Sequence, residues 1–481
     1  MTADRETLPL VGNTPRDGTS TAKRTAGAVF LLVAAVVASL YAIIPSGHRV
    51  DNNDEVADLQ QIVDAHTALF SGVVEVRSKT GNDETKCLLS NAYCFAHEEF
   101  QVPMATDVIF PIGSNSKLFT SVALYQLQEK NKVNLSLPVN TYLTQQDFAA
   151  FGFPNQTTWC PRVEDAAPDS PCENITFVQL MYMGSGIGDE LNCDNVPSER
   201  CHQSANDFAV YRGSIGAHVG MFINDPLVFK PDSNYSYSNM NYVLLSYMVE
   251  KLSGQKFGEY IEEHIAKPLG LNSTYYDEWS GGKKVRFKYA SEYAHFYVKT
   301  DNATNTTVDN PATLKFLSSG TCSPHMHSGA VSGSGGMRST VDDMQRWYLD
   351  LFHDHGRQSR VLTPESIANI VFRHNPINSA YAQGVGAIFE ANNTNASWPD
   401  AFAYCGGVKC TTTCMALHIT GGTSRVASAF SNAQVDVCSS AADFDALVRT
   451  GNLLDPQFLS GAIQPIDVAS RFSAKLAGSI Q

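Results

Sequence analysis

The sequence predicts an α+β fold: strands from both ends of the chain form one antiparallel sheet, helices flank it, and a mainly helical region is inserted between the strands. Segments typical of strands gather before residue 100 and after Ala401, and helical spacing prevails between them. One transmembrane helix is expected to precede this fold. The 481 residues suit one large enzyme domain with an insertion, or about two to four smaller units.

An apolar run without charge covers residues 26–44. At about 1.5 Å per residue, it nearly spans a hydrocarbon core about 30 Å thick. Lys23 and Arg24 precede it, so the positive-inside rule places a tail of residues 1–25 in the cytoplasm. We therefore expect a signal-anchor helix, a polar stem over residues 45–65, and a single-pass type II membrane protein whose bulk is lumenal or extracellular. A cleaved signal peptide, with an apolar region of about 7–15 residues, is the alternative.

The cysteines agree with export, because all 11 follow the apolar run. Close neighbours are expected to form local disulfides: Cys87 with Cys94, Cys160 with Cys172, and Cys193 with Cys201. Cys405, Cys410 and Cys414 are expected to pair with Cys438 or with each other rather than to bind zinc. Sequons that predict N-glycosylation begin at Asn134, Asn155, Asn174, Asn234, Asn272, Asn302, Asn305, Asn392 and Asn395.

Local patterns predict the elements in chain order. Two strands over residues 69–78 and 86–100 form a hairpin that turns at Gly81-Asn82. Apolar residues at helical spacing predict helices over residues 118–130 and 239–254, the second ended by Gly254. Short strands are then expected at 414–420, 425–430 and 433–438, followed by a helix at 441–449.

Ser114-Asn115-Ser116-Lys117 lies where a strand-like segment passes into a helix. A helical spacing of three places Ser114 and Lys117 on one face, within hydrogen-bonding reach. A serine hydroxyl is a weak nucleophile until a base takes its proton, and lysine can be that base when burial lowers its pKa. The pattern alone arises often by chance, so its meaning depends on the rest of the chain.

The run from Thr106 to Leu143 resembles the nucleophile region of the serine β-lactamase and penicillin-binding-protein family, in its class C-like branch. The family's later landmarks resemble, in order, ITFVQLMYMGSGI, Tyr237-Ser238-Asn239, KPLGLNST, GAVSGSGGMRSTVDDMQRW, YAQGVG and HITGGTSRVASAF. The resemblance covers residues 73–432. It implies a β-lactamase-related domain over residues 66–440, with a helical insert over about 125–330, and a C-terminal helical segment over residues 441–481.

The resemblance also implies roles for single residues. Ser114 would be the acyl-accepting nucleophile, Lys117 its general base, and Tyr237 the carrier of the proton to and from the leaving group. Asn239 would bind the amide or carbonyl of the substrate. The oxyanion hole would consist of the backbone N–H groups of Ser114 and Gly422, donors that act on the charge formed in the transition state.

Thr420-Gly421-Gly422 aligns with the third motif of the family, in which Thr420 and Gly421 would bind substrate. Most members have Lys or His just before this motif, whereas Ile419 occupies that position here and His418 comes one residue earlier. On a strand, an offset of one residue points a side chain to the opposite face. Either a β-bulge brings His418 into the substrate-binding site, or the site lacks this cation.

No cofactor and no metal are expected, because an acyl-enzyme mechanism needs neither. His325-Met326-His327 and His353-Asp354-His355 lack the spacing of a metal motif and are interpreted as loop histidines. The net charge of −14, without a basic tract, argues against nucleic acid as a main partner.

Two functions remain open. The first is a membrane-anchored, glycosylated serine hydrolase that forms an acyl-enzyme on Ser114 and acts as an esterase, a peptidase or an acyl transferase on a small ester, amide or peptide-like substrate. The second is a catalytically inactive β-lactamase-like ectodomain with a binding or assembly role, which the residue at Ile419 favours. The sequence leaves the oligomeric state open.

Overall fold

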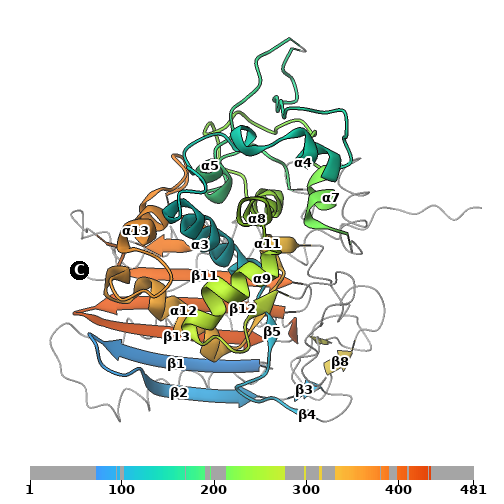
Figure 1. The fold of residues 1–481 in the computed structure, drawn as a ribbon. Coiled ribbons are helices and arrows are strands. Elements are labelled where there is room, and N and C mark those ends of the chain that lie inside the picture. The colour runs from blue at the N-terminus through green and yellow to red at the C-terminus, as the bar shows by residue number, and fades with distance from the viewer. Residues whose placement is uncertain are drawn as a thin grey trace, which may run out of the picture.

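The computed structural model describes residues 72–93, 95–97, 102–167, 169–189, 196, 213–276, 297–299, 314–316, 331–379, 381–388, 398–408, 411–431 and 433–434. A six-stranded antiparallel sheet with the order β10-β11-β12-β13-β1-β2 forms its base (Figure 1). Its strands are β1 (Gly72–Thr80), β2 (Lys86–Tyr93), β10 (Gly386–Ile388), β11 (Ala401–Val408), β12 (Thr411–Thr420) and β13 (Thr423–Ser431). The predicted sheet, built from both ends of the chain, is confirmed.

Helices lie on one face of the sheet, and several extend well away from it (Figure 1). They are α3 (Ser116–Glu129), α4 (Gln145–Ala150), α5 (Phe177–Met181), α7 (Ile215–Gly220), α8 (Asn239–Ser253), α9 (Phe257–Ile261), α10 (Lys267–Leu269), α11 (Ser332–Gly335), α12 (Val341–Phe352) and α13 (Pro364–Phe372). α12 packs on β13 and β1, while α3 packs on α8 and α11. The helices predicted at 118–130 and 239–254 are α3 and α8, and Gly254 ends α8 in the left-handed conformation.

Smaller elements complete the fold. The short strands are β3 (Phe95–His97), β4 (Val102–Pro103), β5 (Phe110–Pro111), β6 (Tyr275–Tyr276), β7 (Tyr297–Lys299), β8 (Leu314–Phe316), β9 (Met337–Ser339) and β14 (Ala433–Gln434). The 3-10 helices are η2 (Gly113–Asn115), η3 (Val139–Tyr142) and η8 (His353–Gly356), and η4 (Glu262–Ala266) is a π-helical turn.

Both faces of the sheet are apolar. The large core between the sheet and the helices includes Phe402, Leu417 and Phe430, whereas a smaller cluster on the other face includes Val76 and Ala416. Neighbouring residues of a strand point to opposite faces, so β1, β11, β12 and β13 contribute to both clusters. This alternation decides which side chains of β11 and β12 can reach the helices.

The sequence pattern does not predict β11, because two glycines interrupt its apolar run. The structure shows why glycine is present: Gly406 and Gly407 pack against η2, which contains Ser114. A Cβ atom on Gly406 would lie 2.0 Å from the carbonyl oxygen of Ile112 and 2.8 Å from the backbone nitrogen of Ser114. Only a residue without a side chain lets the two backbones approach this closely.

The predicted disulfides have different outcomes. Cys160 and Cys172 are bonded as expected, and Cys405 pairs with Cys414, which is one of the expected alternatives. The predicted bond between Cys87 and Cys94 is wrong, because Cys87 is a free thiol. It stands near the start of β2, and its thiol donates to the carbonyl oxygen of Leu89 over 3.6 Å.

Several predictions fall outside the described residues. They are the tail at 1–25, the apolar run at 26–44, the stem at 45–65, the helix at 441–449 and the pair Cys193 and Cys201. Among the helices that the structure does describe, none combines the length and the apolar character that crossing a bilayer requires.

We expect Gly406→Ala to lower the free energy of unfolding by about 1–3 kcal/mol, since its Cβ atom would push β11 away from η2. Gly407→Ala is the matched control: its Cβ atom would meet only the carbonyl oxygen of Thr411, at an ordinary 3.7 Å. Chemical denaturation of both variants measures the difference. Equal stability of the two variants would contradict the close packing of Gly406.

Candidate active site

Ser114 and Lys117 meet where η2 passes into α3. Gly113, with φ of 51°, allows the sharp turn that presents Ser114 ahead of the helix. Lys117 lies in the first turn of α3, and its Nζ atom donates a hydrogen bond of 3.0 Å to Ser114 Oγ. The predicted meeting of the two side chains is confirmed.

Tyr237 and Asn239 reach the same place from the start of α8. The Tyr237 hydroxyl lies 2.7 Å from Ser114 Oγ, and Asn239 Oδ1 accepts a hydrogen bond of 2.8 Å from Lys117 Nζ. A further acceptor is the carbonyl oxygen of Ser334 in α11, 2.8 Å from Lys117 Nζ. The structure therefore brings together four of the residues that the sequence selects, and it adds the Ser334 carbonyl, which no sequence pattern reveals.

The environment of Lys117 suits a base. Its side chain is fully buried, and burial lowers its pKa to about 7, although the Asp189 carboxylate acts in the opposite direction. A large fraction of the amine is then neutral at neutral pH. A neutral amine keeps two protons, one each for Asn239 Oδ1 and the Ser334 carbonyl, and its lone pair can accept the proton of Ser114.

Tyr237 is a poor candidate for that base. Burial raises its pKa above the usual value for a phenol, despite the hydrogen bonds from Ser114 and Tyr404. The hydroxyl of Tyr404 donates to the Tyr237 oxygen over 3.3 Å. Tyr237 is thus a protonated hydroxyl within a chain of hydrogen bonds, which suits a group that relays a proton.

Asp189 is a member of the site that sequence reasoning missed. It is fully buried, and its Oδ2 accepts a hydrogen bond of 3.0 Å from Asn239 Nδ2. Because a carboxylate only accepts, it fixes the amide of Asn239 so that Oδ1 faces Lys117. Met183 supports the same loop from behind, since its sulfur accepts from the Ser238 nitrogen at 3.4 Å. The sequence signal for this site residue was an acidic side chain, Asp189, at the end of the apolar stretch that begins at Met181.

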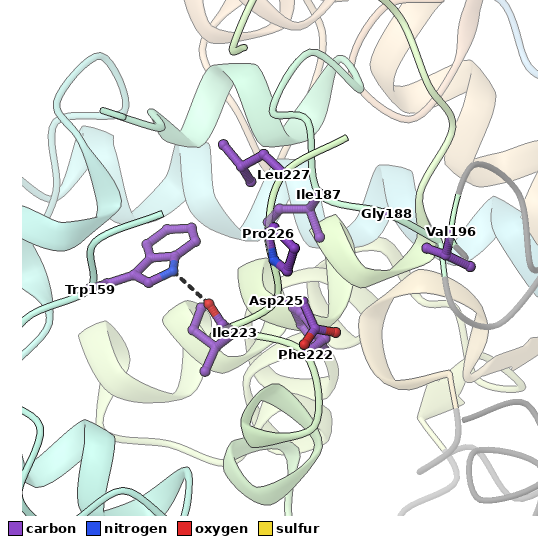
Figure 2. Close-up of a pocket in the computed structure, with 9 residues that line it drawn as sticks. All are labelled: Trp159, Ile187, Gly188, Val196, Phe222, Ile223, Asp225, Pro226 and Leu227. Atoms are coloured by element: carbon purple, nitrogen blue, oxygen red, sulfur yellow. Dashed lines mark hydrogen bonds between the residues drawn. The ribbon is translucent and has the colours of Figure 1, made fainter. Parts of the chain in front are cut away.

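A small cavity of about 10 Å³, the space of about one water, lies beside the segment that carries Asp189 (Figure 2). Gly188 lines it, and the carbonyl of Gly188 accepts a hydrogen bond of 2.9 Å from Ser238 Oγ. On another side, Trp159 Nε1 donates to the carbonyl of Ile223 over 2.6 Å (Figure 2). The cavity has room for no substrate, and Asp225 is the charged residue in its lining.

The residues predicted to form the third motif lie away from Ser114. Thr420 ends β12, and Gly421 and Gly422 form the exposed hairpin turn to β13, where the Gly422 carbonyl meets Gly81. The part of β12 near η2 is Thr413, seven residues and about 23 Å of strand away. Thr420, Gly421 and Gly422 therefore do not join Ser114, and the predicted place of Gly422 in its oxyanion hole is wrong.

His418 is also outside the site. The registers of β12 with β11 and with β13 are continuous, so no bulge redirects it, and it shares the face of Ala401 and Arg425. Leu417 and Ile419 point to the helices instead. Burial lowers the pKa of His418 to about 4, which leaves the ring neutral at neutral pH. Of the two predicted alternatives, the β-bulge that would bring His418 into the site is wrong, and the described residues of the site lack this cation.

β11 occupies the place expected of the third motif. Tyr404 points to the helices and meets Tyr237, and Gly406 and Gly407 lie against η2. Cys405, between them, points to the other face and is tied to Cys414 on β12. An aromatic residue followed by a glycine pair was the sequence signal, and the more obvious glycine pair at 421–422 obscured it.

The remaining predicted features either make no hydrogen bond to Ser114 or lie outside the described residues. The sequon residues Asn134, Asn155, Asn174, Asn234 and Asn272 are exposed, and Asn302, Asn305, Asn392 and Asn395 lie outside the described residues. His353 bonds Ser424 Oγ and the carbonyl of Gly81. Throughout the described ranges, no three His, Cys, Asp or Glu side chains gather as metal ligands would.

Known proteins resemble this chain in sequence and in fold. The family model described as Beta-lactamase matches residues 83–455. Protein flp of Staphylococcus aureus (strain MW2) is 26% identical over 189 residues, which are 39% of this chain and 32% of that protein. Penicillin-binding protein 4* of Bacillus subtilis (strain 168) is 23% identical over 276 residues, 56% of this chain and 50% of its own. The chain thus spans a third to a half of the length of these relatives.

Among solved structures, the D-amino acid amidase of Ochrobactrum anthropi SV3 has a similar fold. Its complex with D-phenylalanine superposes with a TM-score of 0.55 and 17% sequence identity. The match covers 89% of this chain and all of the amidase chain.

The base assigned to Lys117 predicts how acylation of Ser114 depends on pH. The labelling rate with a fluorophosphonate should rise as pH increases, with a midpoint near the Lys117 pKa of about 7, because only the neutral amine accepts a proton. Asp189→Asn removes a charge that favours the ammonium, so the midpoint should move down by up to about one pH unit. The plateau rate should also fall, since the Asn239 amide loses its fixed orientation.

Asp232→Asn is the matched control, because this carboxylate binds Tyr182 and Gln179 and not the amine. Rates are measured between about pH 5 and 9 by intact mass. An unchanged midpoint in Asp189→Asn would refute the electrostatic link between Asp189 and Lys117.

Proposed function

The chain belongs to the beta-lactamase family, and on that premise we propose that it is a serine hydrolase that forms an acyl-enzyme on Ser114. One observation carries the proposal: Ser114 Oγ is hydrogen-bonded to a buried lysine amine and to a tyrosine hydroxyl at 3.0 and 2.7 Å. A structural serine has no need of a neutral base held at this distance. The substrate would be a small ester, amide or peptide-like compound, and hydrolysis or transfer to another acceptor would complete the reaction.

In the first step, Ser114 Oγ attacks the carbonyl carbon of the substrate while its proton passes to the lone pair of Lys117 Nζ. Lys117 becomes an ammonium with three protons, and three acceptors surround it: Ser114 Oγ, Asn239 Oδ1 and the Ser334 carbonyl. The site is therefore organised for the protonated product of this transfer as well as for the neutral base.

The carbonyl oxygen of the substrate becomes negative in this step. We assign its stabilisation to the backbone N–H of Ser114 and to the N–H of Gly407 on β11, in place of Gly422. Support comes from the close approach of these backbones, since the nitrogen of Gly407 lies 2.7 Å from where a Cβ of Gly113 would stand. The N-terminal end of α3 adds a favourable dipole.

The tetrahedral intermediate collapses when the bond to the leaving group breaks. Tyr237 gives its proton to the leaving oxygen or nitrogen and is reprotonated from the Lys117 ammonium. Water then attacks the acyl-enzyme, its proton returns by the same groups, and the acid leaves with Ser114 restored. Asn239 has one amide proton left for the substrate carbonyl, because its other proton is bound to Asp189.

We also propose that the protein is anchored in a membrane by residues 26–44, with its bulk glycosylated in the secretory pathway. The uncharged apolar run, the cysteines that follow it and the exposed sequon residues support this. Extraction of cell membranes with alkaline carbonate, before and after deletion of residues 26–44, tests the anchor. Release of the full-length protein would contradict it.

The test of the catalytic proposal is labelling of the full-length protein with a fluorophosphonate, read by intact mass. Wild type should gain one adduct, Ser114→Ala none, and Lys117→Ala should react at least about a hundredfold more slowly. Ser121→Ala, a buried serine of the same helix, should label normally. Well-folded wild type that takes no adduct, from this probe or from β-lactam and small-ester probes, would instead support a binding protein that has kept the fold.

A further inference from the structure

Four tyrosine rings gather around the nucleophile. The ring centroid of Tyr381 lies 6.3 Å from that of Tyr237, 5.8 Å from Tyr404 and 6.1 Å from Tyr235. Tyr381 is buried, whereas the other three are partly exposed. Two of these phenols, Tyr237 and Tyr404, are linked to Ser114 Oγ by hydrogen bonds and therefore lie beside a molecule bound there.

Tyr404 stands where the third motif is expected to begin with a cation. Its hydroxyl donates to the Tyr237 oxygen, which itself lies 2.7 Å from Ser114 Oγ. The phenol proton of Tyr404 is therefore already engaged in a hydrogen bond to Tyr237. Burial raises the pKa of Tyr404 well above its usual value, so the group carries no charge at neutral pH.

The charges near Ser114 do not favour an anion. Lys117 is buried, its pKa is lowered to about 7, and its amine is directed at three protein acceptors. In the described part of the chain, the charged side chain that acts on both Lys117 and Tyr237 is the buried Asp189, which is negative. The other groups facing the amine are neutral rings, Tyr237 and Tyr242, at 4.8 and 5.6 Å. The net charge of the whole chain is −14.

A substrate carboxylate beside Tyr404 would lose its hydration without gaining a cationic partner from the described residues, which is strongly unfavourable. A neutral group at the same place loses far less. We propose that the site selects acyl donors without negative charge, that is neutral esters or amides, and that Tyr404 sets this preference. This inference rests on the function proposed above.

The experiment compares two esters of hippuric acid that are matched in size and differ in one group on the leaving phenol. 3-Carbamoylphenyl hippurate is neutral, and 3-carboxyphenyl hippurate is negative. For the full-length protein, kcat/KM for each ester is divided by its spontaneous hydrolysis rate at the same pH, and Ser114→Ala gives the background. The neutral ester should be favoured by about tenfold or more, the usual size of a missing charged hydrogen bond.

Two variants test the role of Tyr404. Tyr404→Lys introduces a cation and should shift the ratio toward the carboxylate ester by about tenfold or more. Tyr404→Phe introduces none, so it should keep the preference for the neutral ester, while kcat falls because Tyr237 loses a hydrogen-bond donor. The wild-type ratio decides the charge preference even where a variant fails to fold.

The possible results distinguish a wrong charge preference from a wrong proposed function. Equal or faster turnover of the carboxylate ester by wild type would overturn the inference. If Ser114 is labelled by the fluorophosphonate but neither ester is hydrolysed, 3-carbamoylphenylboronic and 3-carboxyphenylboronic acids are compared as competitors of labelling, and the neutral one should again be favoured about tenfold. Failure of Ser114 to label would overturn the proposed function, and the inference with it.

Discussion

The burial of the Lys117 amine is the constraint on which the rest of the site depends. An ammonium removed from water is unstable, so burial itself makes the neutral base, and no neighbouring cation is needed to lower the pKa. The same burial demands a partner for every N–H, and the chain supplies acceptors from η2, α8 and α11. All three elements are thus connected by hydrogen bonds to one atom, Lys117 Nζ.

Asp189 shows how the surrounding fold adjusts this base. Its carboxylate orients Asn239 and opposes the effect of burial, so that the amine is neither fully charged nor fully neutral near pH 7. Ser238 and Met183 hold the segment of Asp189 against the start of α8. The helical region therefore holds the groups around the Lys117 amine through a few buried contacts and does not merely cover the sheet.

The sheet contributes through β11. Gly406 lets this strand reach η2, and the alternation of the strand points Tyr404 toward the nucleophile and Cys405 toward the disulfide on the far face. A neutral phenol next to Tyr237, in place of a cation, gives this site its character. The register of β11 therefore decides that Tyr404 is the residue that lies beside Tyr237.

The sequence by itself determined the sheet built from both chain ends, the helices α3 and α8, and the meeting of Ser114 with Lys117, because strand alternation, helical spacing and a spacing of three act over short distances. It also selected Tyr237 and Asn239 through their motif. It placed the third motif at the glycine pair 421–422, which forms an exposed turn, whereas the pair at 406–407 makes the close approach to η2. Only the tertiary structure decided which strand end lies at Ser114, because register and strand order depend on contacts between residues far apart in the chain.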